Sequence, residues 1–275
     1  MTQLSATDLS QYVRLENCER YLWLRLHPRE TRALLQRWDV TEQPLTPLLR
    51  ESGAEFEEIV NKDIARRTRH VLEGDMLESP EKTIAALRAV AQPTVFKQAA
   101  LAAEIGGHAV RGRADVIHVS RDEKGRLNCA IADVKASRRE RVEHRLQIAV
   151  YARMLRRMAT EAGIPLGELS GAVLHFEDDG SIPDLFNVEK RFDLSTYETI
   201  VGRFLEPLDS VVNRVASTPF ARTQYHLTYK CDGCLYNALC MFDTAERMDL
   251  SLTPQLTATD KRVLNELGIR TLPEL

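Results

Sequence analysis

The sequence predicts an α/β fold in which helices flank a mixed central sheet. The first observation is a pair of strand-like runs, Val110 to Val119 and Leu127 to Ala136, which a polar turn containing Gly125 connects. The second is a long helical run, Arg139 to Ala162, that follows them directly. The third is another strand-like run, Leu169 to Glu177. Strands and helices that alternate in this way favour one sheet with helices packed on its faces.

Further helices and one further strand complete the predicted layer arrangement. The helical segments are Ser5 to Leu35, Leu45 to Leu72, Ser79 to about Ala91, and Thr196 to Val215. We expect Ser5 or Thr7 to cap the first segment and Pro28 to end its second helix. The apolar stripe of the second segment consists of Leu48, Leu49, Phe56, Ile59, Val60 and Ile64. In the last segment, the expected core residues are Ile200, Phe204, Leu208 and Val212. Thr94 to Ile105 is the further strand, and Gly106-Gly107 turns it into a hairpin.

The strand from Leu127 to Ala136 ends in two charged residues. Residues of one parity are apolar up to Ile131 and then become Asp133 and Lys135. Burying charges costs several kcal/mol unless they are paired or bind a metal. We therefore expect a partner for these two residues, and Asp115 on the preceding strand is the obvious candidate.

Three motifs in this region occur in a characteristic order. They are Gly112-Arg113-Ala114-Asp115 on the first strand, Asp133-Val134-Lys135 on the second, and Gln147-x-x-x-Tyr151 on the helix. This order resembles the PD-(D/E)XK nuclease superfamily, and the Gln/Tyr element resembles its RecB-like branch. The resemblance implies a restriction-endonuclease-like core and a nuclease that hydrolyses phosphodiester bonds.

The resemblance also implies a role for each motif residue. Asp115 and Asp133 would hold Mg²⁺ or Mn²⁺, and the Val134 carbonyl would complete the metal shell. Lys135 would position or deprotonate the attacking water, while Gln147 and Tyr151 would lie on a helix beside the active site. Elementary chemistry agrees, because close carboxylates repel unless a cation lies between them. A metal-bound water also becomes a nucleophile near neutral pH.

The segment Glu51 to Val60 resembles the first motif of the same family, in which a Gly is followed by a metal-binding His. Phe56 lies at or next to the position expected for that His, which is a departure from the family pattern. Glu55, Glu57 and Glu58 surround it. We expect Glu57 to supply the third metal ligand, and the alternative is an acidic face that only contacts solvent.

Three cysteines lie close together near the C-terminus. Cys231, Cys234 and Cys240 are expected in one short loop, and the C-x-x-C spacing lets two sulfurs reach one metal. Cys18 remains as the fourth ligand, since Cys129 lies mid-strand and is expected to be a core thiol. This pattern resembles the iron-sulfur subgroup of RecB-like nucleases, which includes the AddB-type nuclease domain and the CRISPR adaptation nucleases. The resemblance implies a [4Fe-4S] cluster that joins the N- and C-terminal segments, whereas thiolates alone fit zinc as well, and free structural thiols are the third possibility.

Composition and charge limit the ways in which the protein is expected to bind nucleic acid and where it is expected to be located. The chain has 275 residues and a formal net charge of -3, which argues against nucleic-acid binding through bulk positive charge. Basic residues nevertheless outnumber acidic ones between Arg111 and Arg157, around the expected active site. We see no signal peptide and no apolar run long enough to span a bilayer, so the cytoplasm is the expected location and no membrane partner is expected.

The chain is expected to divide into a nuclease domain and a tail. Residues 1–245 would form the nuclease domain with its iron-sulfur site, and 246–275 a helical tail. The tail helix, Asp260 to Leu267 with its Gly268 stop, resembles half of a helix-hairpin-helix DNA-binding unit. A small capping helix packed on the domain is the alternative. We also expect this chain to be one part of a longer polypeptide, with a helicase or further nuclease domain in the same or another chain as a partner.

The resemblance, together with these observations, implies a Mg²⁺- or Mn²⁺-dependent deoxyribonuclease that acts on single-stranded DNA or DNA ends. Exonuclease action is favoured over endonuclease action, and DNA repair or recombination, or CRISPR spacer acquisition, is the expected setting. The first alternative is a catalytically lapsed iron-sulfur module that binds DNA and is attached to a helicase or other nuclease. The second is a structural protein held together by zinc.

Overall fold

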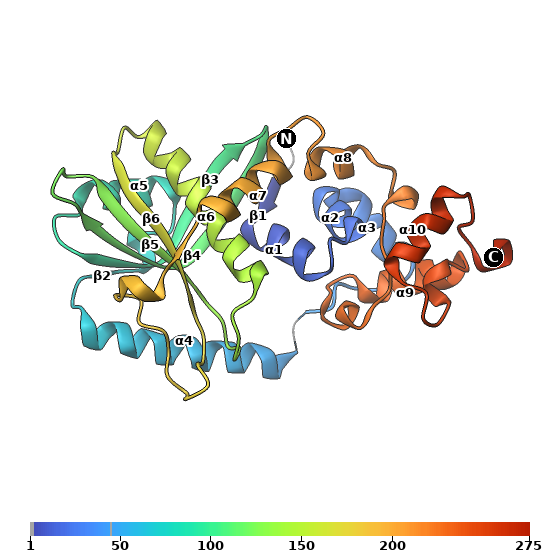
Figure 1. Ribbon diagram of the computed structural model, residues 1–275, viewed down its shortest axis with the longest axis horizontal. Helices are drawn as coiled ribbons and strands as arrows, with labels where there is room; N and C mark the ends of the chain where they lie inside the picture. The colour runs from blue at the N-terminus through green and yellow to red at the C-terminus, as the bar shows by residue number, and fades with distance from the viewer. Residues whose placement is uncertain (1–2, 45) are drawn as a thin grey trace. The chain divides into compact units, whose positions relative to one another are not determined.

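The computed structural model describes residues 3–44 and 46–275, which form two compact units. The first comprises Met1–Ser10 and Pro47–Val211 and is here called the sheet unit. The second comprises Gln11–Thr46 and Val212–Leu275 and is here called the cysteine unit. Each unit therefore combines segments from distant parts of the chain. In Figure 1 the cysteine unit is blue where it comes from the N-terminal part and orange to red where it comes from the C-terminal part.

In the described part of the chain, seven strands of the sheet unit form one mixed sheet (Figure 1). The strands are β1 Gln3–Ser5, β2 Val71–Leu72, β3 Thr94–Ile105, β4 His108–Arg121, β5 Leu127–Val134, β6 Leu166–Leu174 and β7 Phe192–Asp193. Their order is β2-β3-β4-β5-β6-β7, and β1 pairs in parallel with β4. β3, β4 and β5 are antiparallel neighbours, whereas β5 and β6 run parallel. The predicted mixed α/β architecture is confirmed.

Glycines at two turns set the register of the three central strands. Gly106 and Gly107 between β3 and β4 have φ values of 59° and 81°, and Gly125 between β4 and β5 has a φ of 76°. These left-handed conformations suit glycine because it has no Cβ. Both predicted hairpins are confirmed, although β5 ends at Val134 rather than at Ala136.

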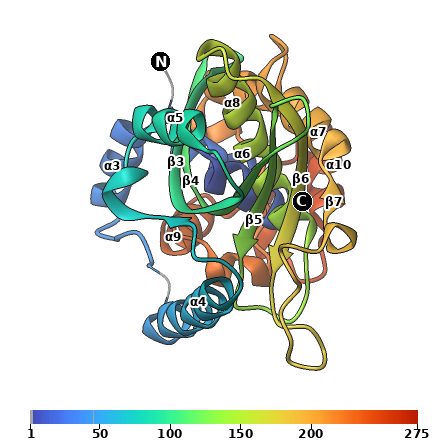
Figure 2. The same cartoon turned by 90° about the vertical axis from the view of Figure 1, so that its left-hand side faces the viewer.

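Helices cover both faces of the sheet. They are α4 Pro47–Arg67, α5 Pro80–Ala89, α6 Val142–Glu161 and α7 Ser195–Leu205. From α4, Phe56 and Val60 pack into a core cluster with Ala130 and Ala132 of β5. Asp133 has the opposite parity on β5 and lies near Tyr151 of α6, so α6 covers the other face. Figure 2 shows α4 and α6 from the side of the sheet unit.

Helix α4 differs from its prediction in its bounds and in its buried face. α4 ends at Arg67 and residues 71–72 form a strand, while the predicted start at Leu45 lies outside the described residues. The predicted apolar stripe is also too wide, because Leu48 and Leu49 are 73% and 58% exposed and Ile59 is exposed as well. Phe56, Val60 and Ile64 alone form the buried stripe of α4.

The helix predicted from Thr196 to Val215 is wrong as a single element. It is two helices, α7 Ser195–Leu205 and α8 Val211–Ser217, with a break that contains Pro207. Proline lacks the backbone N–H and clashes with the preceding turn, which explains the break. Leu208, predicted as a core residue, is 97% exposed in this connection.

The cysteine unit consists of short helices. The α-helices are α2 Glu19–Leu26, α3 Pro28–Arg37, α8, α9 Asn237–Glu246 and α10 Ala258–Glu266, while α1 Ala6–Arg14 contributes residues to both units. The short 3₁₀ helices of the chain are η1 Gly74–Met76, η2 Val188–Lys190, η3 Phe220–Arg222, η4 Tyr229–Gly233, η5 Leu250–Leu252 and η6 Leu272–Glu274. Ser5 caps α1 as predicted, because the Asp8 N–H donates to its Oγ at 3.1 Å. α2 ends before Pro28, also as predicted, and Leu22 and Leu239 are fully buried in this unit.

In the ranges that the structure describes, no helix is both long enough and apolar enough to cross a membrane.

Candidate active site

The two acids singled out by the sequence lie on neighbouring antiparallel strands. The paired register of β4 and β5 ends at Val116 and Ala132, and Asp115 and Asp133 are the next residues along the two strands, close enough for the Asp115 carboxylate to act on Asp133. Directly opposed residues point to the same face of a sheet, about 5 Å apart at Cβ. The backbone N–H of Val134 donates to Asp115 Oδ2 at 2.9 Å and fixes this carboxylate at the end of the pair. The predicted meeting of the two acids is therefore present.

The Asp133 carboxylate is buried, and only one of its two oxygens accepts a hydrogen bond within the described residues. Its side chain has no exposed surface, and Lys135 Nζ donates to Oδ1 at 2.9 Å. Oδ2, by contrast, has no hydrogen-bond donor among the described residues. Burial raises the pKa of Asp133 to about 7, with Lys135 opposing this shift and Asp115 adding to it. An unsatisfied buried carboxylate oxygen beside a second carboxylate fits a hard divalent cation.

Lys135 remains a cation in this arrangement. Burial by itself would lower its pKa, but the carboxylates of Asp133 and Asp115 raise it above the ordinary value. The side chain is 31% exposed, so the ammonium reaches solvent at the edge of the site. The sequence left open whether Lys135 orients a water or accepts its proton. The raised pKa favours orientation, because a protonated amine only donates hydrogen bonds.

Gln147 and Tyr151 lie on one face of α6, as their spacing predicts. Both side chains are buried, and Gln147 Nε2 donates to the Tyr151 hydroxyl at 3.0 Å. Burial raises the pKa of Tyr151 well above its ordinary value, and the Asp115 carboxylate adds to this shift. A Cβ on Gly112 would lie 2.6 Å from Tyr151 Cε1. The glycine of the first motif thus leaves room for the tyrosine ring against β4.

Phe56 occupies the core and not the site. Only 1% of its surface is exposed, and its ring centroid lies 4.4 Å from that of Phe176. A phenyl ring offers no ligand to a cation such as Mg²⁺, which takes oxygen ligands. Where the family pattern has a metal-binding His, this chain has a packing residue.

Of the three acids next to Phe56, Glu57 is the one whose pKa is affected by the charges of Asp115 and Lys135. Burial raises the pKa of Glu57, the Asp115 carboxylate adds to this, and Lys135 opposes it. Glu58 instead forms an ion pair with Lys62 at 2.7 Å on the exposed side of α4. Both side chains are exposed, but the charges of Asp115 and Lys135 act on Glu57, whereas Glu58 pairs with Lys62.

His144 is a site residue that the sequence reading missed. It lies on α6 three residues before Gln147, is 9% exposed, and its Nδ1 has no hydrogen-bond partner among the described residues. Burial lowers its pKa to about 4, and the nearby Lys135 ammonium lowers it further. The ring is thus neutral at pH 7. The sequence could have revealed His144, since its spacing from Gln147 and Tyr151 places all three residues on one helix face.

Gln98 is a second residue that the sequence did not reveal. It lies on β3, and its side-chain amide donates to Asp115 Oδ1 at 3.2 Å. Its φ of 54° is rare for a residue other than glycine. Backbone strain of this kind clusters at functional sites. No motif in the sequence marks this position.

Many of the basic residues around the site are engaged in ion pairs. The engaged residues include Arg126 with Asp122, Arg145 with Glu140, Arg156 with Glu198, and Arg157 with Glu161. Arg138 and Arg139 are exposed and form no ion pair within the described ranges. They follow Lys135 closely in the loop after β5, so both are able to contact phosphate near the acid pair.

The four cysteines named from the sequence line one small cavity of the cysteine unit. Cys18 is the N-cap of α2, Cys231 lies in η4, Cys234 follows η4, and Cys240 lies on α9. All four line a cavity of about 20 Å³. The expectation that the C-terminal three share a loop is wrong for Cys240, which is helical. Cys129 is buried in β5 of the sheet unit, which confirms it as a core thiol.

Burial and backbone N–H groups both act on these thiols. Burial raises the pKa of Cys18 to about 12 and that of Cys234 to about 11, and neighbouring thiols add to both shifts. Backbone N–H groups point at the sulfurs, with Tyr21 donating to Cys18 Sγ at 3.5 Å and Thr228 donating to Cys231 Sγ at 3.4 Å. Such bonds stabilise thiolates bound to metal. Within the described residues, no three Cys, His, Asp or Glu side chains are already arranged around a single-ion position.

Comparisons with known proteins bear on both sites. A family model described as the PD-(D/E)XK nuclease superfamily matches residues 20–241. A solved structure described as "Crystal structure of SSO0001" is similar over 87% of this chain and 85% of that chain, with 15% sequence identity and a TM-score of 0.37. The comparison with curated proteins found no match. The matched range contains β4, β5 and α6 together with Cys231, Cys234 and Cys240, and begins just after Cys18.

Proposed function

This chain belongs to the PD-(D/E)XK nuclease superfamily, and from this premise we propose that it is a Mg²⁺- or Mn²⁺-dependent deoxyribonuclease with its centre at Asp115 and Asp133. The observation that carries the proposal is the Asp133 carboxylate. It is fully buried, it faces a second carboxylate, and its Oδ2 has no donor among the described residues. An apolar residue would be more stable at this position unless a cation bound there.

The metal shell is proposed to come from three elements. Asp115 and Asp133 supply carboxylate oxygens from β4 and β5, the Val134 carbonyl supplies one from the strand end, and Glu57 supplies one from α4. When bound, a divalent cation makes a coordinated water more acidic and offsets charge that develops on the phosphodiester. Glu57 takes the place of the family His, and its raised pKa is consistent with a position near Asp115.

Lys135 is proposed to orient the attacking water. Its ammonium is held 2.9 Å from Asp133 and stays protonated, so it donates to the water oxygen and to phosphate oxygens. Gln147 and Tyr151 are proposed to hold DNA next to this centre and to brace α6 against β4. His144 is neutral and close to Lys135, and this supports a role in positioning that ammonium.

The proposed substrate is single-stranded DNA or a DNA end, with exonuclease action and 5′-phosphate products. Arg138 and Arg139 support phosphate binding because they are exposed, unpaired among the described residues and close in sequence to Lys135. DNA repair or recombination is the first proposed setting and CRISPR spacer acquisition the second. A helicase or further nuclease domain is the proposed partner.

We also propose that the chain belongs to the RecB-like iron-sulfur subgroup. Cys18, Cys231, Cys234 and Cys240 are the proposed ligands of a [4Fe-4S] cluster. Support comes from their shared cavity and from the backbone N–H groups directed at Cys18 and Cys231. The proposed role is mechanical, since the cluster would join the first helices of the cysteine unit to its C-terminal helices.

Cleavage of labelled DNA by anaerobically purified protein tests the nuclease proposal. Wild-type protein should cut with Mg²⁺ or Mn²⁺ and not with EDTA. Asp133→Asn keeps the side-chain volume and should lower the rate by about 10²-fold or more, because it removes a carboxylate from the metal. Asp209→Asn is the matched control, since Asp209 is exposed and lies outside the site. Equal rates for both variants would overturn the assignment of the centre.

One observation favours a second function, a DNA-binding module that has lost catalysis. Phe56, at or next to the position expected for the family's metal-binding His, is buried in the core. The same assay separates the two functions. Tight DNA binding without cutting in either metal, unchanged by Asp133→Asn, would establish the binding module and exclude the nuclease.

A further inference from the structure

The cysteine unit contains a second and much larger cavity, with a volume of about 680 Å³. Five parts of the chain line it: the loop that precedes α2, residues between 221 and 228, Arg247 with Asp249, one face of α10, and the C-terminal turn from Arg270 to Glu274. Cavities of this size bind small molecules or parts of larger ligands. This cavity borders the four-cysteine cavity, since Cys18, Tyr225 and His226 line both, but the proposals above give its charged residues no role.

Basic side chains dominate the wall of this cavity. They are Arg222, Arg247, Lys261, Arg262 and Arg270, whereas the acidic ones are Glu16, Asp249, Glu266 and Glu274. Most of these acids already have partners. Asp249 binds Lys261 Nζ at 2.5 Å, and Glu16 binds Lys230 at 3.1 Å. Glu274 accepts backbone N–H bonds at the C-terminal turn.

The wall therefore carries unmatched positive charge. Arg222 and Arg262 are exposed and form no ion pair within the described part of the chain. Glu266, the remaining acid, lies on α10 one turn beyond Arg262. Two flexible guanidinium groups at one cavity are able to bind an oxyanion with several charge-assisted hydrogen bonds.

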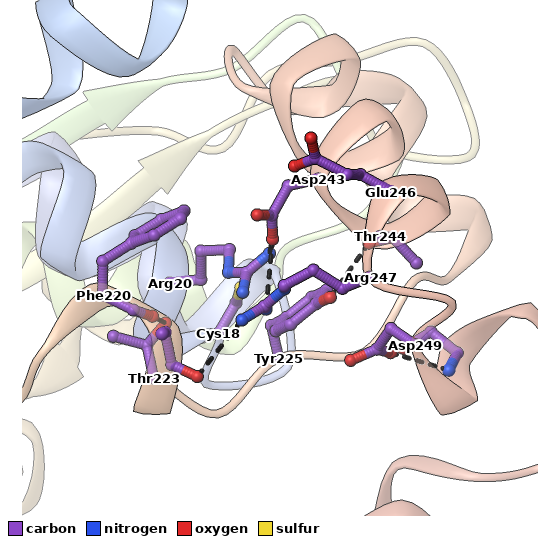
Figure 3. Close-up of polar contacts among 12 residues, drawn as sticks. Cys18, Arg20, Phe220, Thr223, Tyr225, Asp243, Thr244, Glu246, Arg247 and Asp249 are labelled. Carbon is purple, nitrogen blue, oxygen red and sulfur yellow. Dashed lines mark hydrogen bonds and ion pairs between the residues drawn. The ribbon is translucent and has the colours of Figure 1, made fainter. Parts of the chain in front are cut away.

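Arg20, Arg247 and Lys261 form a cationic framework, and the last two also line the cavity. Figure 3 shows Arg20 and Arg247 beside Tyr225 and Asp243. The Tyr225 ring has Arg20 Cζ at 3.4 Å and Lys261 Nζ at 3.8 Å from its centroid. Arg20 is fully buried and binds Asp243 at 2.6 Å, and Arg247 binds the same carboxylate at 3.1 Å. One acid thus serves two arginines.

This framework is short of acceptors. Arg20 Nε and Nη2 and Arg247 Nε are buried without hydrogen-bond acceptors among the described residues. Within the described ranges, the three cations Arg20, Arg247 and Lys261 form ion pairs with two acids, Asp243 and Asp249. An excess of cations, two of them buried, favours a bound anion nearby.

The backbone at the cavity mouth is strained. Glu16 and Asn17 are consecutive, line the cavity, and have φ values of 58° and 60°. Two successive left-handed residues that are not glycine are rare, and such strain concentrates at ligand sites. The loop that carries them leads directly into Cys18.

We propose that this cavity is a phosphate-binding site, which takes the phosphate of a nucleotide or of a DNA strand. Arg222 and Arg262 contact the phosphate oxygens, and the framework of Arg20, Arg247 and Lys261 adds positive potential at the cavity. This site is separate from the acid pair of the sheet unit. It binds its ligand whether or not that centre cuts DNA.

Calorimetry on the full chain tests this proposal in an Asp133→Asn background, which prevents cutting. The probes are inorganic phosphate, deoxyadenosine monophosphate, and a single-stranded oligonucleotide. Arg262→Ala should weaken binding about tenfold through loss of charge-assisted hydrogen bonds. It should also lower the slope of log affinity against log salt by about 0.7 for the oligonucleotide. Arg222→Ala is a second variant with the same expected effect.

The matched control is Arg32→Ala, because Arg32 is exposed on α3 of the same unit and lies outside the cavity wall. If the mononucleotide displaces bound phosphate and the oligonucleotide does not, the ligand is a free nucleotide. If the oligonucleotide displaces bound phosphate, the ligand is a DNA strand. Either result supports the site. No binding of any phosphate probe, or equal losses in Arg262→Ala and Arg32→Ala, would overturn it. Failure of the nuclease assay would leave these outcomes unchanged, since they are measured without cutting.

Discussion

The acid pair of the sheet unit and the four thiols of the cysteine unit rest on different kinds of support. Asp115 and Asp133 lie opposite each other on two hydrogen-bonded strands, and the backbone N–H of Val134 fixes the first of them. The thiols lie on a helix cap, a 3₁₀ helix, a loop and a helix, so no ladder of backbone bonds relates Cys18 to Cys240. The acid pair is therefore held by the sheet without a metal, whereas a metal bound by the thiols, as proposed, would also stabilise the fold of the cysteine unit.

The largest expected effect follows from breaking the thiol site. Cys18→Ser should remove bound iron and visible absorbance and expose the cysteine unit to limited proteolysis. The loss of stability should be several kcal/mol, because ligand binding that needs a folded site stabilises the fold. Iron content, absorbance and proteolytic mapping measure this.

Cys129→Ser is the control for that variant, since Cys129 is also buried but lies in β5. Burying a hydroxyl in place of a thiol should cost about 1 to 3 kcal/mol, with iron content unchanged. Equal iron in both variants would remove Cys18 from the ligand set. Equal zinc and no iron would replace the cluster with a zinc site.

The next effect tests whether α4 contributes packing or ligands at Phe56. Phe56→Ala should lower the free energy of unfolding by about 3 to 5 kcal/mol, because it leaves a cavity against Phe176. Ile59→Ala on the same helix should change it by less than about 0.5 kcal/mol, since Ile59 is 44% exposed. Urea unfolding measures both. A stable Phe56→Ala protein with altered metal affinity would contradict the core assignment.

The sequence could predict the acid pair because strand geometry is local. Alternation placed Asp133 on a buried face, and a turn at Gly125 brought Asp115 opposite it. The thiols were predictable for another reason, namely residue type and spacing. The secondary structure around the thiols was harder to predict, since Cys240 was expected in a loop and lies on α9.

What the sequence could not predict depends on tertiary packing. A periodic stripe placed Leu48 in the core, yet nothing in its pattern says where the covered surface ends, and the residue is 73% exposed. Leu208 failed because Pro207 breaks the helix that would have buried it. Gln98 reaches Asp115 through a strained backbone conformation, which composition does not encode.

A smaller effect sharpens the account of the acid pair itself. Glu57→Gln should lower the cleavage rate by about 10- to 100-fold, because Glu57 is the acid of α4 near Asp115. Glu58→Gln should leave the rate unchanged, since its carboxylate pairs with Lys62. Rates measured across a Mn²⁺ titration would separate metal affinity from turnover. Similar losses in both variants would indicate a general effect of acidic charge on α4.

The smallest expected effects come from two glycines of the sheet unit. Gly112→Ala should destabilise by about 1 to 2 kcal/mol, because its Cβ would lie 2.6 Å from Tyr151 Cε1 and force the ring away from β4. Gly53→Ala should stabilise by about 0.5 to 1 kcal/mol, since a Cβ there meets nothing within 4 Å and alanine is the better helix former. Thermal unfolding measures both signs, and cleavage should fall only in Gly112→Ala. Loss of stability without loss of cleavage would mean that Tyr151 packs against β4 but does not hold the substrate, because the ring would then be displaced with no effect on the reaction.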